Sequence, residues 1–227
     1  ESIVGQINTE LKKPMTDIPF FLNLFASENG RYEMNTHFNH KFNDYWSTGF
    51  YIHGNKRSQK FDNNDDGFLD LPLSDQINLM NRWQYTDIEK GWVSFLSWRY
   101  MNDEKLLGTL SYDPKKDRGL KNRWGSEIKT KRWDASLKIG YVFPEIPYQS
   151  FGLQTAYSSH DQNSYYGLRT YDINQQSFYT NMIYNSIIGN TLNKFKVGLN
   201  YSFDEYIEEV NGDSFNRTDQ NLGSFLS

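Results

Sequence analysis

Residues 131–143, KRWDASLKIGYVF, decide the fold class of this chain. Every second position carries an apolar or aromatic side chain, and the positions between them are mostly polar or small; the apolar set is Trp133, Ala135, Leu137, Ile139, Tyr141 and Phe143. Successive side chains of a β-strand point to opposite faces, so this alternation predicts a strand with one apolar and one polar face.

The same period of two recurs along the chain. It is found in residues 20–28, 31–42, 45–55, 76–86, 91–101, 149–159, 174–187 and 194–206, with a tenth candidate strand near 217–226. The stretches are about ten residues long, which suits a tilted strand that crosses a bilayer and exceeds the five or six residues of an average globular strand. Helical spacing is hard to find.

The connections between these stretches alternate in length. Short ones are expected at 42–45, 87–90, 144–148 and 188–193, and long ones at 56–75, 102–130 and 160–173, with a further polar segment from 207 onward. Asn29-Gly30 predicts a tight hairpin. Short turns on one side and long loops on the other are typical of outer-membrane barrels. We therefore expect an all-β fold, an antiparallel transmembrane β-barrel with nine or ten strands in this chain.

The composition fits a barrel wall better than a soluble core. Aromatic residues make up 17% of the chain although hydrophobic residues make up only 37%, and mean hydropathy is -0.78. A disordered chain is poor in aromatics. The net charge of -4 argues against a nucleic-acid partner, and the lack of cysteine excludes disulfides and cysteine metal sites. No apolar run reaches the length of a transmembrane helix. Because the chain begins at Glu1 without a signal peptide, we expect it to be a piece of a longer precursor.

Three segments carry a resemblance to one family. Residues 2–14, SIVGQINTELKKP, contain a Gly-x-Ile-Asn core and a Lys-Lys-Pro ending, and they resemble the segment that closes the plug domain of TonB-dependent outer-membrane receptors. Residues 62–72, DNNDDGFLDLP, and 81–85, NRWQY, resemble the second outer loop and the following strand of such receptors from the Bacteroidetes lineage. The resemblance implies that residues 1–18 end the plug and its linker, and that residues 19–227 form the first part of a 22-stranded barrel.

The resemblance also implies a function. Such a receptor takes up a scarce ligand across the outer membrane of a Gram-negative bacterium, here most readily a ferric siderophore or another metal chelate. Its implied partners are outer-membrane lipid and lipopolysaccharide, a small-molecule ligand, a surface lipoprotein, and a TonB-type energy-transducing complex that acts through a TonB box before Glu1. No nucleic acid is implied.

Other functions stay open at this point. The barrel could be a scaffold component of an envelope complex, or the protein could be a soluble β-protein that binds glycans. A small ten-stranded outer-membrane hydrolase would use Asp65, Asp66 and His160. No nucleophile elbow, zinc-protease motif or phosphate-binding loop is present, so the sequence does not predict an enzyme.

An acidic loop presents a candidate calcium site. Counting Asp62 as the first position of an EF-hand-like loop over residues 62–73, Asn64, Asp66 and Asp70 fall at positions three, five and nine. Leu73 stands where a bidentate Glu is expected. The alternative is a solvated turn rich in Asp and Asn.

A basic loop presents a candidate ligand site. It contains Lys115, Lys116, Arg118, Arg123 and Trp124. Guanidinium groups bind carboxylates and phosphates, and Trp stacks on flat rings. The loop could capture an anionic chelate, bind lipopolysaccharide phosphates at the outer rim, or simply be solvated. On the strands, His37 and His53 share a polar face and are predicted to line the lumen.

Overall fold

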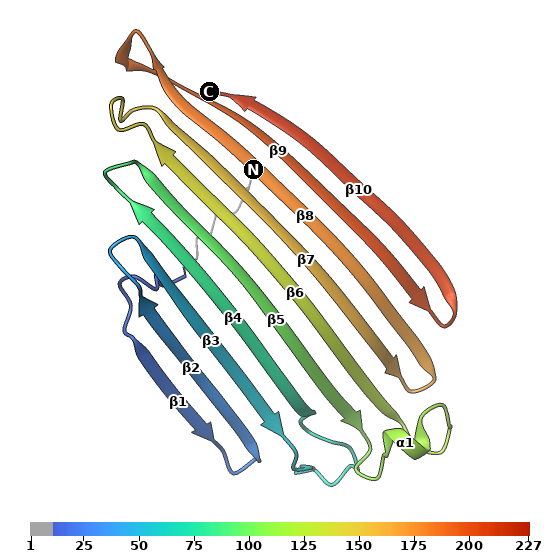
Figure 1. Cartoon of the computed structure of the whole chain (residues 1–227). Helices are drawn as coiled ribbons and strands as arrows, with labels where there is room; N and C mark the ends of the chain where they lie inside the picture. The colour runs from blue at the N-terminus through green and yellow to red at the C-terminus, as the bar shows by residue number, and fades with distance from the viewer. Residues whose placement is uncertain (1–10) are drawn as a thin grey trace.

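The computed structural model describes residues 11–227 as one antiparallel sheet with a single short helix (Figure 1). The elements are β1 (Phe20–Ala26), β2 (Arg31–Lys41), β3 (Trp46–Arg57), β4 (Leu73–Asp87), β5 (Trp92–Gly108), α1 (Pro114–Asp117), β6 (Gly125–Val142), β7 (Ser150–Tyr166), β8 (Arg169–Ile188), β9 (Asn190–Val210) and β10 (Asp213–Leu226). Among these residues no helix is long and apolar enough to cross a bilayer.

Each strand pairs with its neighbours in the sequence, in the order β1 to β10. The register is continuous apart from one irregularity at Ile187/Ile188, in the pairing of β8 with β9. The sheet is open, with β1 and β10 at its two edges (Figure 1). The prediction of an all-β antiparallel fold is confirmed, and the tenth candidate strand exists as β10. The sheet is not closed into a barrel.

The Asn-Gly hairpin is also confirmed. The amide of Gly30 donates to the carbonyl of Ser27 at 3.0 Å, and Gly30 has a φ of 63°. That left-handed conformation costs glycine little, which is why the turn closes here.

Three of the predicted long connections are too long. The polar segment expected from 207 onward is wrong: β9 runs on to Val210 and β10 begins at Asp213, so Asn211 and Gly212 alone make that turn. The loop expected over 160–173 is wrong: β7 runs on to Tyr166, β8 begins at Arg169, and Gly167 and Leu168 alone make the turn. The loop expected over 102–130 shrinks to residues 109–124. Pairing between strands uses backbone groups and needs no apolar side chain. Beyond Ser159 the side chains are polar on both faces, so the sequence pattern does not reveal that the strand continues through its backbone pairing.

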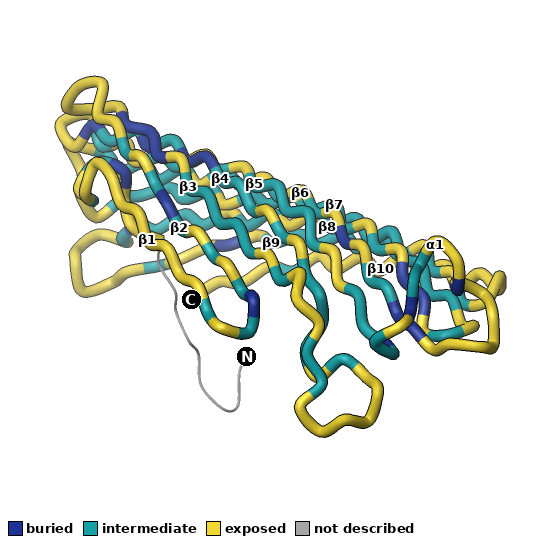
Figure 2. The backbone as a smooth tube through the Cα atoms, turned by 90° about the horizontal axis from the view of Figure 1, so that it is seen from below, coloured by how far each residue is buried: buried dark blue, intermediate teal, exposed yellow. Residues whose placement is uncertain are grey.

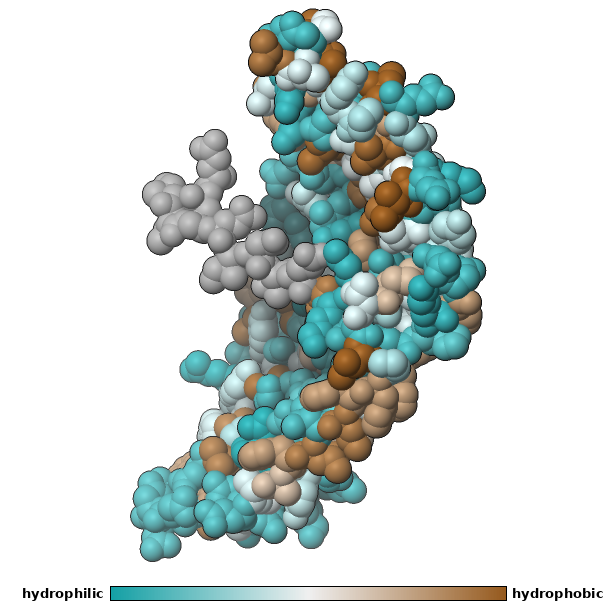
Figure 3. All heavy atoms as spheres, turned by 90° about the vertical axis from the view of Figure 1, so that its left-hand side faces the viewer, coloured by the Kyte–Doolittle hydropathy of each residue, from teal (hydrophilic) through white to brown (hydrophobic). Residues whose placement is uncertain are grey.

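The two faces of the sheet differ in chemistry. One face carries large apolar side chains at alternate positions, such as Leu96, Trp98 and Trp133, and these are exposed. The sheet is curved, and hydrophobic residues gather along the bulging side of the crescent (Figure 3). The described part of the chain buries only two hydrophobic side chains, Tyr112 and Tyr165, and most of the sheet is exposed or half-buried (Figure 2). The sheet therefore has no core of its own on its apolar, convex face.

Candidate functional site on the concave face

A linker segment, residues 11–17, lies against the concave face of β4. The guanidinium Nη1 of Arg82 donates to the carbonyl oxygens of Leu11 at 3.0 Å and Lys12 at 2.8 Å. The Arg82 guanidinium carbon lies 4.6 Å from the centroid of the Phe95 ring. Arg82 is buried, with an exposed fraction of 7%. A buried charge that donates to two carbonyls and stacks on a ring fixes the linker to the sheet.

Two further contacts hold the linker segment. The amide of Met15 donates to the side-chain oxygen of Gln84 at 3.4 Å. The carboxylate of Asp17 lies 3.5 Å from Nε2 of His37 on β2. Burial acts to raise the pKa of Asp17, but hydrogen bonds from the Ile18 amide and the Lys12 ammonium hold that pKa below its ordinary value. The linker segment is therefore anchored on β4 and also contacts β2.

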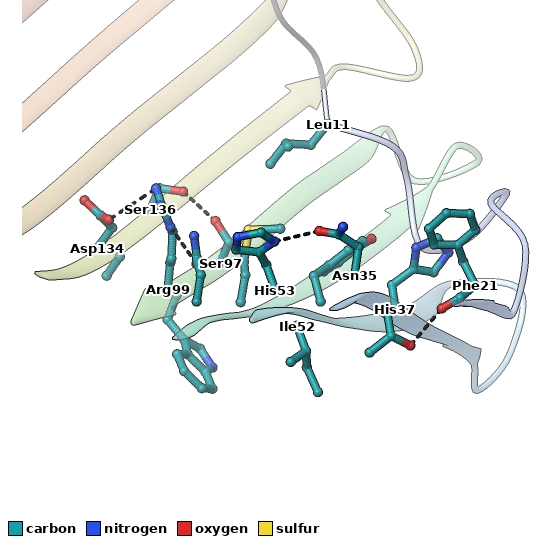
Figure 4. Close-up of a pocket in the computed structure, with 16 residues that line it drawn as sticks. Leu11, Phe21, Asn35, His37, Ile52, His53, Ser97, Arg99, Asp134 and Ser136 are labelled. Atoms are coloured by element: carbon teal, nitrogen blue, oxygen red, sulfur yellow. Dashed lines mark hydrogen bonds and ion pairs between the residues drawn. The ribbon is translucent and has the colours of Figure 1, made fainter. Parts of the chain in front are cut away.

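The linker borders a cavity of about 560 Å³ on the concave face (Figure 4). The residues that line it are Leu11, Phe21, Asn35, Thr36, His37, Tyr51, Ile52, His53, Asn78, Met80, Ser97, Trp98, Arg99, Asp134, Ala135 and Ser136. In Figure 4 the side chains of His53 and Arg99 point into the cavity, whereas that of Ile52 points away on the far side of the sheet. One end of the cavity is apolar and aromatic, where Phe21 stacks on His37 at a centroid distance of 5.4 Å.

The other end of the cavity is a polar network. Nδ1 of His53 lies 2.7 Å from the side-chain oxygen of Asn35, and its Nε2 lies 3.2 Å from that of Gln76. Nε of Arg99 donates to Asn78 at 2.9 Å, and its Nη1 lies 4.0 Å from the carboxylate of Asp134. The network spans β2 to β6 and offers both donors and acceptors to a polar surface or ligand.

The prediction that His37 and His53 share a face is confirmed, since His37 pairs with Tyr51, which has the same parity as His53 on β3. Sequence reasoning missed Arg82, Arg99 and Asp134. Each is a charged residue that points to the concave face of an otherwise alternating strand. A charge at such a position is the sequence signal that could have identified these residues. Among residues 11–227 no group of three or more His, Asp or Glu is placed to hold a metal ion.

The acidic loop between β3 and β4 uses its carboxylates internally. Asp62 accepts from the amides of Asp66 at 3.2 Å and Gly67 at 2.8 Å. Asp66 accepts from the amide of Phe68, and Asp70 from that of Asn63, each at 2.8 Å. The side-chain amide of Asn64 donates to Asp66 at 3.0 Å. The structure thus brings the four predicted ligands into one turn. The carboxylates already accept hydrogen bonds from amides of that turn. Calcium binding stays a prediction.

The basic loop between β5 and β6 is largely held by its own contacts. Arg123 donates to the carboxylate of Asp117 at 3.3 Å, and Lys116 lies 3.6 Å from Asp113. The guanidinium of Arg118 lies 4.6 Å from the centroid of Tyr165 on β7. The ring of Trp124 lies 6.3 Å from that of Phe68 in the acidic loop. The side chain of Lys115 is exposed. Ligand binding by this loop stays a prediction.

The structure does not bring together the three residues that the hydrolase alternative would use. In the part of the chain that the structure describes, no hydrogen bond or ion pair joins Asp65 or Asp66 to His160. Asp65 and Asp66 lie in the exposed loop after β3, whereas His160 lies in β7, beside Arg132 of β6. Of the motif in residues 2–14, residues 2–10 lie outside the described part of the chain. The chain matches no known protein-family model, no curated protein and no solved structure.

Proposed function

We propose that this chain forms part of the wall of a TonB-dependent outer-membrane receptor. The observation that carries the proposal is the division of one sheet into an apolar convex face and a polar concave face, with the linker segment fixed to the concave face by Arg82. The convex face meets lipid. The concave face meets the plug, whose last residues lead into the linker.

The convex face has the layers that a membrane wall requires. Cross-strand aromatic pairs lie on it at Trp46–Tyr85, Trp92–Tyr141 and Tyr100–Trp133, with ring centroids 4.8, 4.6 and 4.5 Å apart. The first two pairs lie near the short turns and the third lies toward the long loops. Trp92 and Tyr100 are separated by roughly 26 Å along β5, or roughly 20 Å along the axis of a barrel whose strands tilt by about 40°. That span is close to the apolar band of about 25 Å between aromatic girdles in such barrels.

The open edges support a larger barrel. β1 and β10 each leave one row of backbone donors and acceptors unpaired in the sheet. Within lipid every such group must be paired, because no water is present to replace the missing partner. Further strands that join these two edges would complete a closed wall, in keeping with the 22 strands that the resemblance implies.

The transport step follows from this arrangement. A ferric siderophore or another metal chelate enters from the side of the long loops and binds above the plug. A TonB-type complex, driven by the proton gradient, pulls on the plug from the opposite side. The linker segment stays attached to β4 through Arg82 and Gln84, so the pull is resisted at the wall and deforms the plug.

The test begins with the natural protein in purified outer membranes. We expect detergent-dependent extraction and an electrophoretic band far heavier than 26.8 kDa that shifts on boiling. Uptake of a radiolabelled ferric siderophore should stop when the proton gradient is collapsed. Extraction without detergent would sink the membrane assignment, and uptake that survives loss of the gradient would sink the energised transport.

A further inference from the structure

The loop between β5 and β6 folds over the convex face. We call residues 109–124 the outer cap. Along β6, Gly125 has the same parity as Trp133 and Leu137, so it belongs to the convex face. A Cβ atom at Gly125 would overlap the ring of Tyr112, which therefore covers the convex side of the strand. The Tyr112 hydroxyl donates to that of Tyr165 at 2.9 Å, and both tyrosines are buried.

The outer cap is an ordered surface. The carboxylate of Asp117 accepts from the amide of Asp113 at 2.9 Å and from Arg123 at 3.3 Å, and Asp117 is buried. The amide of Thr109 donates to the carbonyl of Trp124 at 3.0 Å, and the amide of Leu110 donates to Gly67 at 2.9 Å. The Asp117 and Thr109 bonds hold the backbone of the outer cap together, and the Leu110 bond joins the outer cap to the neighbouring loop.

On the convex face, basic side chains lie beyond the outer aromatic pair, on the side of the long loops. Trp133 packs against Tyr100 at the outer end of the apolar band, with their rings tilted by 40°. Lys131 lies two residues further along β6, about 7 Å by the rise of a strand. Arg118 lies beyond it, on the ring of Tyr165. In a bilayer the phosphates lie just outside the acyl chains. Aromatic rings at the interface, followed by cations one to two residues further out, match that order.

Arg118 and Lys131 are exposed cations available to a ligand, as are Lys115 and Lys121 of the outer cap. Lys129 is paired with Glu127 at 3.1 Å, and Arg123 is paired with Asp117. Lys131 lies opposite Asp161 in the register but makes no ion pair with any of residues 11–227, and neither does Arg118. Arg118 is oriented by its stacking on Tyr165, which leaves its N–H groups free of internal acceptors within the described chain.

We propose that Arg118 and Lys131 bind the phosphate groups of a lipid in the outer leaflet, with its acyl chains against Trp133. The inference rests on the proposed function, because it requires the convex face to lie in a membrane. Arg forms charge-assisted hydrogen bonds to phosphate, and Lys contributes a point charge. The outer cap covers the convex side of β6 and β7, so this geometry favours a lipid phosphate over a chelate bound on the concave side.

The experiment uses the full protein in detergent and two lipids that differ only in phosphate. Native mass spectrometry would measure binding of lipid A and of dephosphorylated lipid A. We expect lipid A to bind about tenfold more tightly, the effect of roughly one charge-assisted hydrogen bond. The double variant Arg118→Gln, Lys131→Gln should lose that difference. The variant Lys131→Arg should keep it, because the charge remains.

The matched control is Lys105→Gln, Lys138→Gln, which removes two charges from the concave face. This variant should bind both lipids as the natural protein does. Equal binding of the two lipids by the natural protein would overturn the proposal, and so would an unchanged preference in the Arg118 and Lys131 variant. Full displacement of lipid A by 10 mM inorganic phosphate, a concentration of about the order used in buffers, would assign the site to free phosphate and overturn the lipid. If the natural protein is extracted without detergent, the proposed function itself has failed.

Discussion

Leu96 and Ser97 are neighbours on β5, yet they lie in opposite surroundings. Leu96 is exposed on the convex face beside Leu137, whereas the hydroxyl of Ser97 lies 2.7 Å from that of Ser136 on the concave face. The same backbone and the same ladder hold both. In this sheet, therefore, the parity of a residue alone decides which surroundings its side chain meets, because a strand sends successive residues to opposite sides.

The largest effect is expected from a charge on the convex face. Leu96→Arg places a guanidinium midway between the aromatic levels, where Arg costs about 2–4 kcal/mol in a transmembrane barrel. We expect a loss of heat-modifiable protein from the outer membrane, measured by electrophoresis of membranes with and without boiling. Ser97→Arg is the control, since it adds the same charge one residue away on the concave face. Equal loss from both variants would remove the distinction between the faces.

The next effect is expected at the linker segment. Arg82→Gln deletes a buried cation that donates to the carbonyls of Leu11 and Lys12, which costs about 1.5–3 kcal/mol for a charged hydrogen-bond partner. We expect the linker to detach and trypsin to cleave after Lys12 about tenfold faster. Arg99→Gln is the control, because Arg99 lies on the same face without contacting the linker. Unchanged cleavage in Arg82→Gln would contradict the anchor.

A smaller effect is expected on the convex side, under the outer cap. Gly125→Ala forces Tyr112 away from β6, at a cost of about 1–2 kcal/mol, the low end for overpacking because a loop can yield. We expect faster proteolysis within residues 109–124 and an unchanged sheet by circular dichroism. At Gly140 on the same strand a Cβ atom would meet only the Val93 oxygen at 3.7 Å, so Gly140→Ala is the matched control. Equal proteolysis in both variants would refute the packing of Tyr112 on β6.

The smallest effect concerns pH. The Asp113 amide, opposed by burial and aided by Arg123, holds the pKa of Asp117 below its ordinary value. Because the pKa of Asp117 is lowered in the folded protein, its charge stabilises the outer cap at pH values above the ordinary carboxyl pKa of 3.8. That stability is lost as pH falls below 3.8 and through the folded pKa. We expect amide exchange in the cap to accelerate over this range while the concave network is less affected. Asp117→Asn should abolish the change in the cap, whereas Asp65→Asn in the neighbouring loop should leave it intact.

The strands were predictable only where their two faces differ. Trp92, Leu96, Trp98 and Tyr100 share one parity on β5, and the sequence located this band. From Asn102 to Gly108 the strand continues with polar side chains on many positions, and the prediction ended too early. The physical reason is that alternation reports the apolar environment, whereas the strand itself is held by backbone bonds that leave no trace in side-chain polarity.

The candidate site was predictable in part for a related reason. The shared face of His37 and His53 follows from parity and could be read directly. Arg82 could be seen as an inward charge, but its partner Leu11 is 71 residues away along the chain. No local pattern encodes a contact of that separation. The same holds for Tyr112 and Tyr165, which are 53 residues apart.

The amino-acid sequence was sufficient to predict an antiparallel sheet with one apolar and one polar face, because a two-residue period follows from strand geometry alone. Tertiary structure alone decided how far each ladder extends, where the linker segment is anchored, and toward which face residues 109–124 fold. These depend on pairing and packing between segments far apart in the chain. Only the folded sheet brings such segments together, and the direction of the outer cap is set by the space that Gly125 leaves for Tyr112.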